Sequence, residues 1–302
     1  MDLKWLQLSV STPQEFVEPL SQIFYRYGHG GVAVEQSGGY NPDEGETLSP
    51  DQWVTVTTYL PINSSTNERR NNIDVGVRLV AHVSPIEGLQ EREIEEEEWQ
   101  DAWKEHFDVL HITNRLVVAP SWKEYSPKPH EAVITLDPGM AFGTGHHPTT
   151  RMCLEQLDEL VKPGMDVIDV GCGSSILSIA AAKLGARHVF GIEIDSVAVN
   201  VAKQNIRDNN LEHTVRPVQG SLPHADVMAD AYDIAIANIS AKIVIEIASE
   251  LVRATKPGGR IIASGILDEN KQGPIDALTA AGATLESTLV DGDWVTLVCA
   301  LT

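Results

Sequence analysis

The spacing of apolar residues in the first hundred positions predicts a small domain of strands and helices. Apolar side chains recur at helical spacing in residues 16–27, and again after Ser65. Thr12, followed by Pro13 and Glu15, predicts the start of the first helix, with Thr12 as its N-cap. Expected strands, of which the last is a strongly charged edge strand, cover 4–10, 31–35, 53–60 and 87–99. The order βαββαβ is that of a small α+β, ferredoxin-like (split βαβ) domain.

The second half of the chain alternates between apolar strands and amphipathic helices, as in an α/β fold. Seven strands are expected, at 166–169, 188–193, 214–219, 232–239, 260–266, 284–290 and 294–301. Residues 291–293, Asp-Gly-Asp, join the last two and predict an antiparallel hairpin. A glycine turn and an alanine-rich helix follow the first strand. This is the opening unit of a Rossmann-like sheet.

The turn after this first strand carries residues typical of ligand binding. Gly171 and Gly173 follow Asp169, and Glu193 ends the next strand about twenty residues later. Glycine allows the backbone to approach a ligand, and an acidic group at this strand end can accept ribose hydroxyls. A dinucleotide fingerprint would need a third glycine where Ile176 stands. The chain also has no phosphate-binding Gly-Lys-Ser/Thr loop and no Gly-x-Ser-x-Gly nucleophile turn. The pattern predicts an adenosine-bearing ligand without a pyrophosphate.

Residues 136–150 form a turn-rich segment just before this unit. Their three glycines and two prolines exclude regular structure over most of the segment, and we expect a lid over the ligand. Thr149 or Thr150 is the expected cap of the helix that follows. His146 and His147 raise the alternative of a metal site. Because no acidic or sulfur ligand follows at zinc-site spacing, structural hydrogen bonds are favoured and no metal is expected.

The length and charge of the chain limit its domain number, its partners and its location. The 302 residues suit two domains, and no apolar run reaches the ~20 residues of a membrane helix. A formal charge of −21 disfavours a nucleic-acid partner; it either favours a basic partner or serves solubility alone. The N-terminus lacks the pattern of a secretion signal, and the three cysteines form neither a disulfide framework nor a metal spacing. We therefore expect a cytoplasmic protein without a membrane partner.

The second half of the chain resembles the class I S-adenosylmethionine-dependent methyltransferases. The resemblance rests on the Asp-x-Gly-x-Gly turn at 169–173, the acidic residue Glu193 and the terminal antiparallel strand pair. It implies a seven-stranded Rossmann-like domain. It also implies that Gly171 and Gly173 approach the methionine moiety of the donor, and that Glu193 binds its ribose.

A longer resemblance, from about residue 99 to the C-terminus, is to the ribosomal protein L11 methyltransferases. It is carried by residues 136–150, by Asp-Val-Gly-Cys-Gly-Ser at 169–174, by Gly-Ile-Glu-Ile-Asp at 191–195 and by Ala-Asn-Ile at 237–239. The chain departs from the family pattern at Ser175, where glycine is usual. The resemblance implies that the donor is contacted by Phe142, Gly143, Thr144, Gly145, Thr150, Asp169, Gly171, Gly173, Glu193 and Asn238.

The same resemblance implies a division of labour along the chain. Residues 1–98 would form a substrate-recognition domain, residues 99–130 a linker with a short helix and a strand, and residues 131–302 the catalytic domain. Asn238, at the end of its strand, is the candidate catalytic residue that orients the accepting amine; capping of the next helix is the alternative. The expected activity is protein-lysine N-methylation: methyl groups pass from S-adenosylmethionine to lysine side chains and the N-terminal amine of ribosomal protein L11, on a monomeric enzyme. Two alternatives stay open: a methyltransferase acting on another protein or small molecule, and a cofactor-binding module without catalysis.

Overall fold

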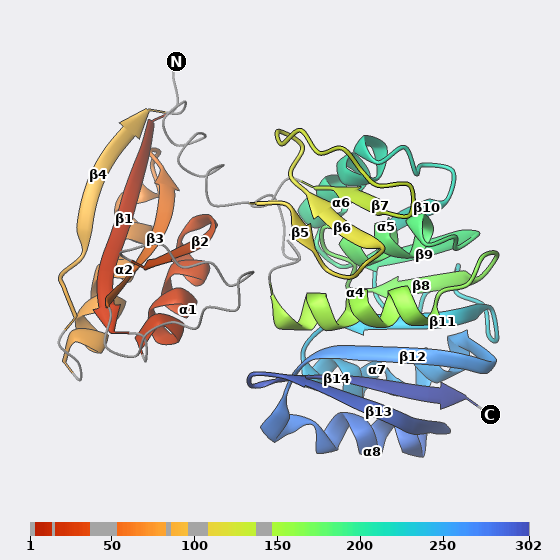
Figure 1. Cartoon of the computed structure of the whole chain (residues 1–302). Coiled ribbons are helices and arrows are strands. Elements are labelled where there is room, and N and C mark those ends of the chain that lie inside the picture. The colour runs from red at the N-terminus through yellow and green to blue at the C-terminus, as the bar shows by residue number, and fades with distance from the viewer. Residues whose placement is uncertain are drawn as a thin grey trace. The chain divides into compact units, whose positions relative to one another are not determined.

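The computed structural model describes residues 4–13, 16–36, 53–82, 86–95, 108–136 and 147–301. The chain forms two compact units, Met1–Phe107 and Asp108–Thr302 (Figure 1). The segments expected to form the short helix at 99–107 and most of the lid, 137–146, lie outside the described residues. Within the described residues, no helix has the length and apolar character that crossing a bilayer demands.

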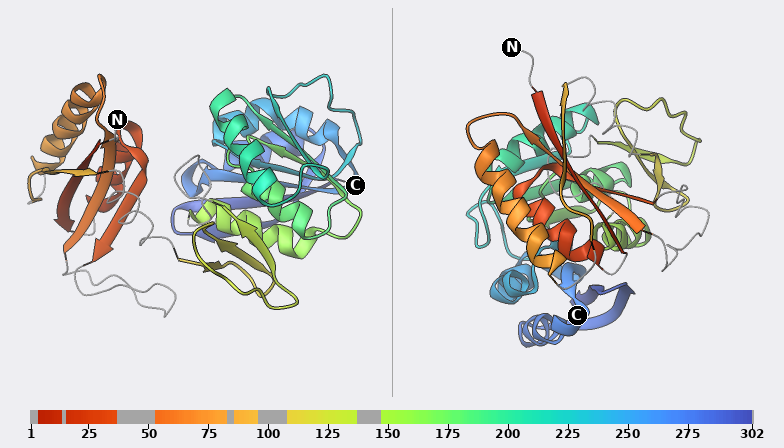
Figure 2. Two further views of the ribbon diagram at one scale, coloured as in Figure 1. Left: turned by 90° about the horizontal axis from the view of Figure 1, so that it is seen from above. Right: turned by 90° about the vertical axis from the view of Figure 1, so that its left-hand side faces the viewer.

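The first unit has the order βαββαβ. Its elements are β1 (Lys4–Pro13), α1 (Val17–Tyr27), β2 (His29–Gln36), β3 (Trp53–Pro61), α2 (Thr66–Ala81) and β4 (Gln90–Glu95). The strands pair antiparallel in the order β2-β3-β1-β4, so the charged β4 is an edge strand as expected. In the right-hand view of Figure 2, α1 and α2 lie side by side against the strands. Their apolar faces meet the sheet in a core that includes Leu8, Phe24, Leu60 and Ile73.

The expected start of the first helix at Thr12 is wrong. β1 continues to Pro13, which pairs with Trp53, and α1 begins only at Val17 without a side-chain cap. Thr12 is fully buried, and its hydroxyl donates to the Pro13 carbonyl at 3.2 Å. The long antiparallel ladder with β3 therefore outweighs a local capping signal.

The second unit is built on a seven-stranded sheet. Its strands are β8 (Asp166–Val170), β9 (His188–Glu193), β10 (Val215–Gln219), β11 (Tyr232–Asn238), β12 (Thr255–Leu267), β13 (Ala283–Asp291) and β14 (Trp294–Leu301). They lie in the order β10-β9-β8-β11-β12-β14-β13. The five from β10 to β12 are parallel to one another. β14 is antiparallel to both of its neighbours, β12 and β13, so the last two strands form the antiparallel pair that the sequence predicts.

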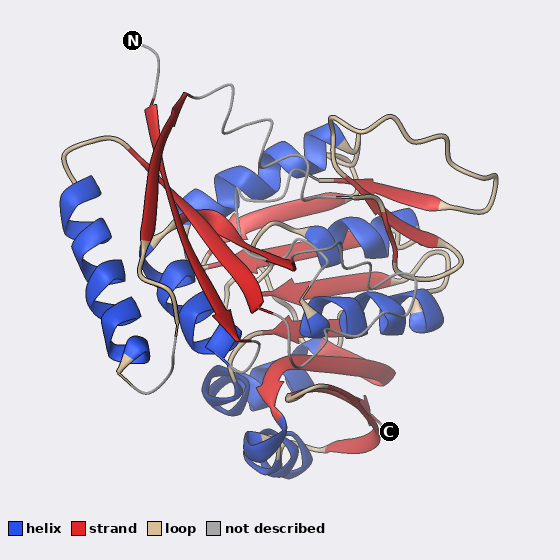
Figure 3. Cartoon of the chain, turned by 60° about the vertical axis from the view of Figure 1, so that its left-hand side comes forward, coloured by secondary structure: helices blue, strands red, loops and turns tan. Residues whose placement is uncertain are grey.

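Helices cover both faces of this sheet (Figure 3). They are α4 (Pro148–Leu160), α5 (Ile176–Lys183), α6 (Ser196–Asp208), α7 (Ala241–Ala254) and α8 (Gln272–Ala280), with a short 3-10 turn, η3, at Asp268–Asn270. Successive residues of β8 face opposite sides of the sheet, and both are apolar. Val167 joins the core under α4, α5 and α6, whereas Ile168 joins the core under α7 and α8. A parallel strand covered on both faces must be apolar on both.

A small three-stranded sheet, in the order β5-β6-β7, belongs to the second unit. Its strands are β5 (Leu110–His111), β6 (Leu116–Ala119) and β7 (Ala132–Thr135). Residues 108–130, expected as part of a linker, thus pack with the larger unit. The apolar side chains of Leu116, Val118 and Ile134 enter the core formed with α4 and α5, which explains the placement.

The order of the strands reverses at β8. β9 and β10 lie on one side of β8, and β11 and β12 lie on the other. At such a reversal the connections leave in opposite directions, which opens a crevice at the carboxyl ends of the strands. The turn after β8 and the end of β11 both lie at this edge.

Candidate active site

The turn after β8 is held in a conformation that needs glycine. Gly171 and Gly173 have φ angles of 74° and 51°, in the left-handed region that favours glycine. The N–H groups of Gly171 and Cys172 both donate to the carbonyl of Ile192 in β9, at 2.8 and 3.0 Å. The turn is therefore fixed across the carboxyl ends of two neighbouring strands.

Ser175 continues this backbone path into α5. Its φ of 65° is also left-handed, and the residue is fully buried at the N-cap of the helix. A side chain in this region carries a steric cost that glycine avoids. A glycine at position 175 would adopt the same φ without this steric cost.

Glu193, at the end of β9, holds the turn from the side. Its Oε2 accepts from the backbone N–H of Gly173 at 3.0 Å, and its Oε1 accepts from that of Asp195 at 3.0 Å. Each carboxylate oxygen has a second lone pair, so the group can still accept ligand hydroxyls. Asp195 caps α6 by accepting from Val197 N at 2.8 Å.

Asp169 is buried beneath the turn. The hydroxyl of Ser178 in α5 donates to its Oδ2 at 2.6 Å, while its Oδ1 has no hydrogen-bond partner among the described residues. Burial raises the pKa of this carboxyl to about 6, although the Ser178 hydrogen bond opposes the shift. Sequence reasoning missed Ser178; the available signal was a hydroxyl within an otherwise apolar stretch of α5.

Asn238 ends β11 on the other side of β8. Its Nδ2 donates to Thr150 Oγ1 of α4 at a long 3.4 Å, and its Oδ1 is buried without a partner among the described residues. The N-cap of α7 is Ser240, so Asn238 does not cap the next helix. Its amide oxygen is left as an acceptor at the carboxyl edge of the sheet.

The helix α4 begins differently from the expectation. His147 is its N-cap, with its side chain accepting from Thr149 N, so neither Thr149 nor Thr150 has that role. The His147 ring also lies edge-on to Trp294, with ring centroids 4.9 Å apart. Both threonines are instead buried within the first turn.

The contacts of His147 are those of a structural residue. Among the described residues, no group of His, Cys, Asp and Glu could hold a metal ion. His146 lies outside the described part of the chain.

The structure brings together at one edge the predicted site residues that it describes: Thr150, Asp169, Gly171, Gly173, Glu193 and Asn238. The other four, Phe142, Gly143, Thr144 and Gly145, lie outside the described residues. Two of the described residues, Asp169 and Asn238, carry buried acceptor oxygens without partners. Unsatisfied buried acceptors are costly, and a ligand amine or hydroxyl can satisfy them. The residues present therefore fit S-adenosylmethionine, which has a ribose, an amine and no phosphate.

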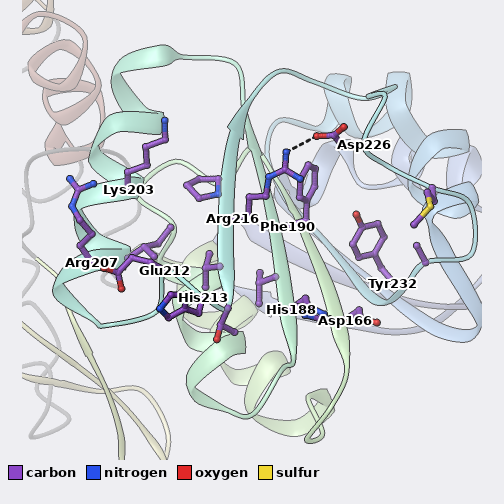
Figure 4. Close-up of a pocket in the computed structure, with 17 residues that line it drawn as sticks. Asp166, His188, Phe190, Lys203, Arg207, Glu212, His213, Arg216, Asp226 and Tyr232 are labelled. Atoms are coloured by element: carbon purple, nitrogen blue, oxygen red, sulfur yellow. Dashed lines mark hydrogen bonds and ion pairs between the residues drawn. The ribbon is translucent and has the colours of Figure 1, made fainter.

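A hollow of about 750 Å³ lies elsewhere, at the amino ends of the strands. It is lined by the first residues of four strands, including Asp166 and His188, and none of the predicted site residues reaches it. Figure 4 shows Arg216 over the ring of Phe190 and paired with Asp226, with Lys203 on the far side of β10. The hollow thus straddles the edge strand, and ligands of open parallel sheets bind at the opposite end.

Comparison with known proteins agrees with this geometry. A family model described as ribosomal protein L11 methyltransferase (PrmA) matches residues 4–302. The ribosomal protein L11 methyltransferase of Chloroflexus aurantiacus is 40% identical over 97% of both chains, and that of Geobacillus thermodenitrificans is 39% identical over 98% of this chain and 99% of its own. The crystal structure of a ribosomal protein L11 methylase from Lactobacillus delbrueckii subsp. bulgaricus matches with a TM-score of 0.60 at 29% identity, over 65% of this chain and 100% of that one. The chain belongs to the ribosomal protein L11 methyltransferase (PrmA) family.

Proposed function

We propose that the protein transfers methyl groups from S-adenosylmethionine to amines of ribosomal protein L11: lysine side chains and the N-terminal amine. One observation carries the proposal: in a chain of this family, the glycine turn, Glu193 and the free acceptor of Asn238 meet at the carboxyl edge of the sheet. Gly171 and Gly173 bring the backbone close to the methionine part of the donor, and Glu193 binds its ribose hydroxyls.

Methyl transfer from this donor depends mainly on how the accepting amine is positioned. When bound, S-adenosylmethionine supplies a methyl group already activated by a sulfonium. The neutral amine would take this methyl, the electron pair of the sulfur–carbon bond would stay with sulfur, and the methylated ammonium would then release one proton to water. A lysine amine has a reference pKa of ~10.4 and must arrive neutral. Asn238 Oδ1, a buried acceptor without a partner among the described residues, would accept from an N–H of that amine and fix its direction.

The first unit is the proposed recognition module for the protein substrate. Its described residues form a complete α+β core, and the predicted donor contacts all belong to the second unit. The net charge of −21 suits a basic protein partner and opposes direct binding of nucleic acid. The proposal also places the enzyme in the cytoplasm as a monomer.

The test is incubation with methyl-labelled S-adenosylmethionine and ribosomal proteins, followed by mass spectrometry. Mass gains in methyl units on L11 are expected, and they should be lost with the Asn238→Ala variant. Label on a different protein would replace the substrate assignment. Binding of the donor without transfer to any protein would instead support a non-catalytic module.

A further inference from the structure

An asparagine of α6 holds the glycine turn from beneath. Asn205 lies within α6 and is 6% exposed. Its Nδ2 donates to the backbone carbonyl of Ser174 at 2.9 Å, and both groups are buried. Ser174 lies in the turn between Gly173 and the left-handed Ser175. Asn205, which is 31 positions from Ser174 in the sequence, therefore fixes a backbone carbonyl of the glycine turn.

This hydrogen bond closes a ring that contains Glu193. Gly173 N donates to one oxygen of Glu193, and Asp195 N donates to the other, each at 3.0 Å. Asp195 then caps α6, and α6 carries Asn205 back to Ser174, the neighbour of Gly173. Each member of the ring is covalently joined or hydrogen-bonded to the next. The helix thus adds a second link between the turn and Glu193, beside the direct hydrogen bond from Gly173 N.

We propose that Asn205 is a positioning residue for the donor site, because it fixes the glycine turn at Ser174 and so supports the neighbouring contact between Gly173 and Glu193. The inference rests on the proposed use of S-adenosylmethionine, whose methionine and ribose parts would contact these two groups. Asn205 itself touches neither part. A shift of the turn relative to Glu193 would weaken both sets of contacts at once.

The helix itself does not depend on Asn205. Asn209, at the C-cap of α6, makes its own links to β7: its Nδ2 donates to Thr135 O at 2.6 Å, and its Oδ1 accepts from Thr135 N at 2.9 Å. Asp195 fixes the other end of the helix. Loss of the Asn205 amide should therefore loosen the turn at Ser174, while α6 and the bonds from Gly171 N and Cys172 N to β9 stay in place.

Two variants and a matched control test the proposal. Asn205→Leu keeps about the size of the side chain and removes the donor without adding a charge, and Asn205→Ser is a milder alternative if the first does not fold. The control is Thr255→Val at the amino end of β12. Thr255 is fully buried, and its hydroxyl donates to the Leu251 carbonyl at 2.7 Å, so it loses the same kind of bond away from the turn.

The first measurement is hydrogen exchange of the backbone amides of residues 171–175 without ligand. The Asn205 variants should exchange faster there, whereas Thr255→Val should not. The second is the dissociation constant for S-adenosylhomocysteine by calorimetry, with urea midpoints measured in parallel. The Asn205 variants should bind about tenfold more weakly or worse, and Thr255→Val should stay within about twofold.

Unchanged exchange in the turn would overturn the positioning role. The role would also be overturned if, in all three variants including Thr255→Val, the loss of affinity simply paralleled the fall in the urea midpoint. Failure of the unaltered protein to bind S-adenosylhomocysteine would be a different result. It would count against the donor assignment, and the exchange measurement would still decide the role of Asn205.

Discussion

The backbone N–H of Gly173 donates to Oε2 of Glu193 at 3.0 Å, across the gap between the glycine turn and the end of β9. One carboxylate thus has two tasks: it shapes the turn, and it keeps lone pairs for the ribose of the proposed donor. The two halves of the donor site are therefore coupled through one side chain.

Glu193→Ala should weaken donor binding by more than the loss of a ribose contact alone. One hydrogen bond to a charged group contributes about 1.5–3 kcal/mol, so the ribose contact alone accounts for a roughly 10- to 150-fold rise in the dissociation constant for S-adenosylhomocysteine. The loosened glycine turn should add to this rise. The control is Glu212→Gln, at the amino edge of the sheet, which should bind normally. Wild-type affinity in Glu193→Ala would contradict both tasks assigned to the residue.

Ser175→Gly should stabilise the protein by about 1 kcal/mol. The φ of 65° costs a serine steric energy that glycine does not have, and this outweighs the greater freedom of glycine in the unfolded chain. Urea unfolding measures the change. Ser174→Gly is the matched control because Ser174 is not in the left-handed region; it should instead destabilise by about 0.5–1 kcal/mol.

Asp169 should make stability fall as pH rises between about 4 and 6. Burial raises the pKa of its carboxyl from 3.8 to about 6, so the folded protein keeps this proton where the unfolded chain has lost it. The contribution of this group to the free energy of unfolding is therefore greatest below pH 4 and is lost by about pH 6. The shift corresponds to about 3 kcal/mol.

Urea unfolding of the wild type and of Asp169→Asn across this pH range measures the effect. The difference between the two curves should change by this amount in the stated direction. Parallel curves would show that Asp169 does not titrate in this range.

Asn238→Ala should lower turnover by about 10²- to 10³-fold, the range seen when one oriented polar group is removed from an active site. Stability should change by less than about 0.5 kcal/mol, because the Asn238 side chain caps no helix and its amide oxygen has no partner among the described residues. Single-turnover methyl transfer and urea unfolding provide the two readouts. Normal turnover, or loss of folding, would contradict the assigned role.

The sequence by itself determined most elements and several residues of the site. The strand, glycine turn and helix around Gly171 and Gly173 are specified by neighbours in the chain, as is the acidic end of β9 at Glu193. The hairpin of β13 and β14 follows from Asp-Gly-Asp between two apolar runs in the same way. Turn chemistry and hydrophobic periodicity are local, and so they can be read without knowing what packs against them.

Only the tertiary structure decided how distant groups share their hydrogen bonds and burial. At Thr12 the pairing of β1 with β3 outweighs the local capping signal. Residues 108–130 belong to the second unit because apolar side chains of this segment pack into its core. The pKa of Asp169 and the bond from Asn205 to Ser174 likewise depend on which helix covers which strand end. These partners are set by packing over many residues of separation, which no spacing within the sequence encodes.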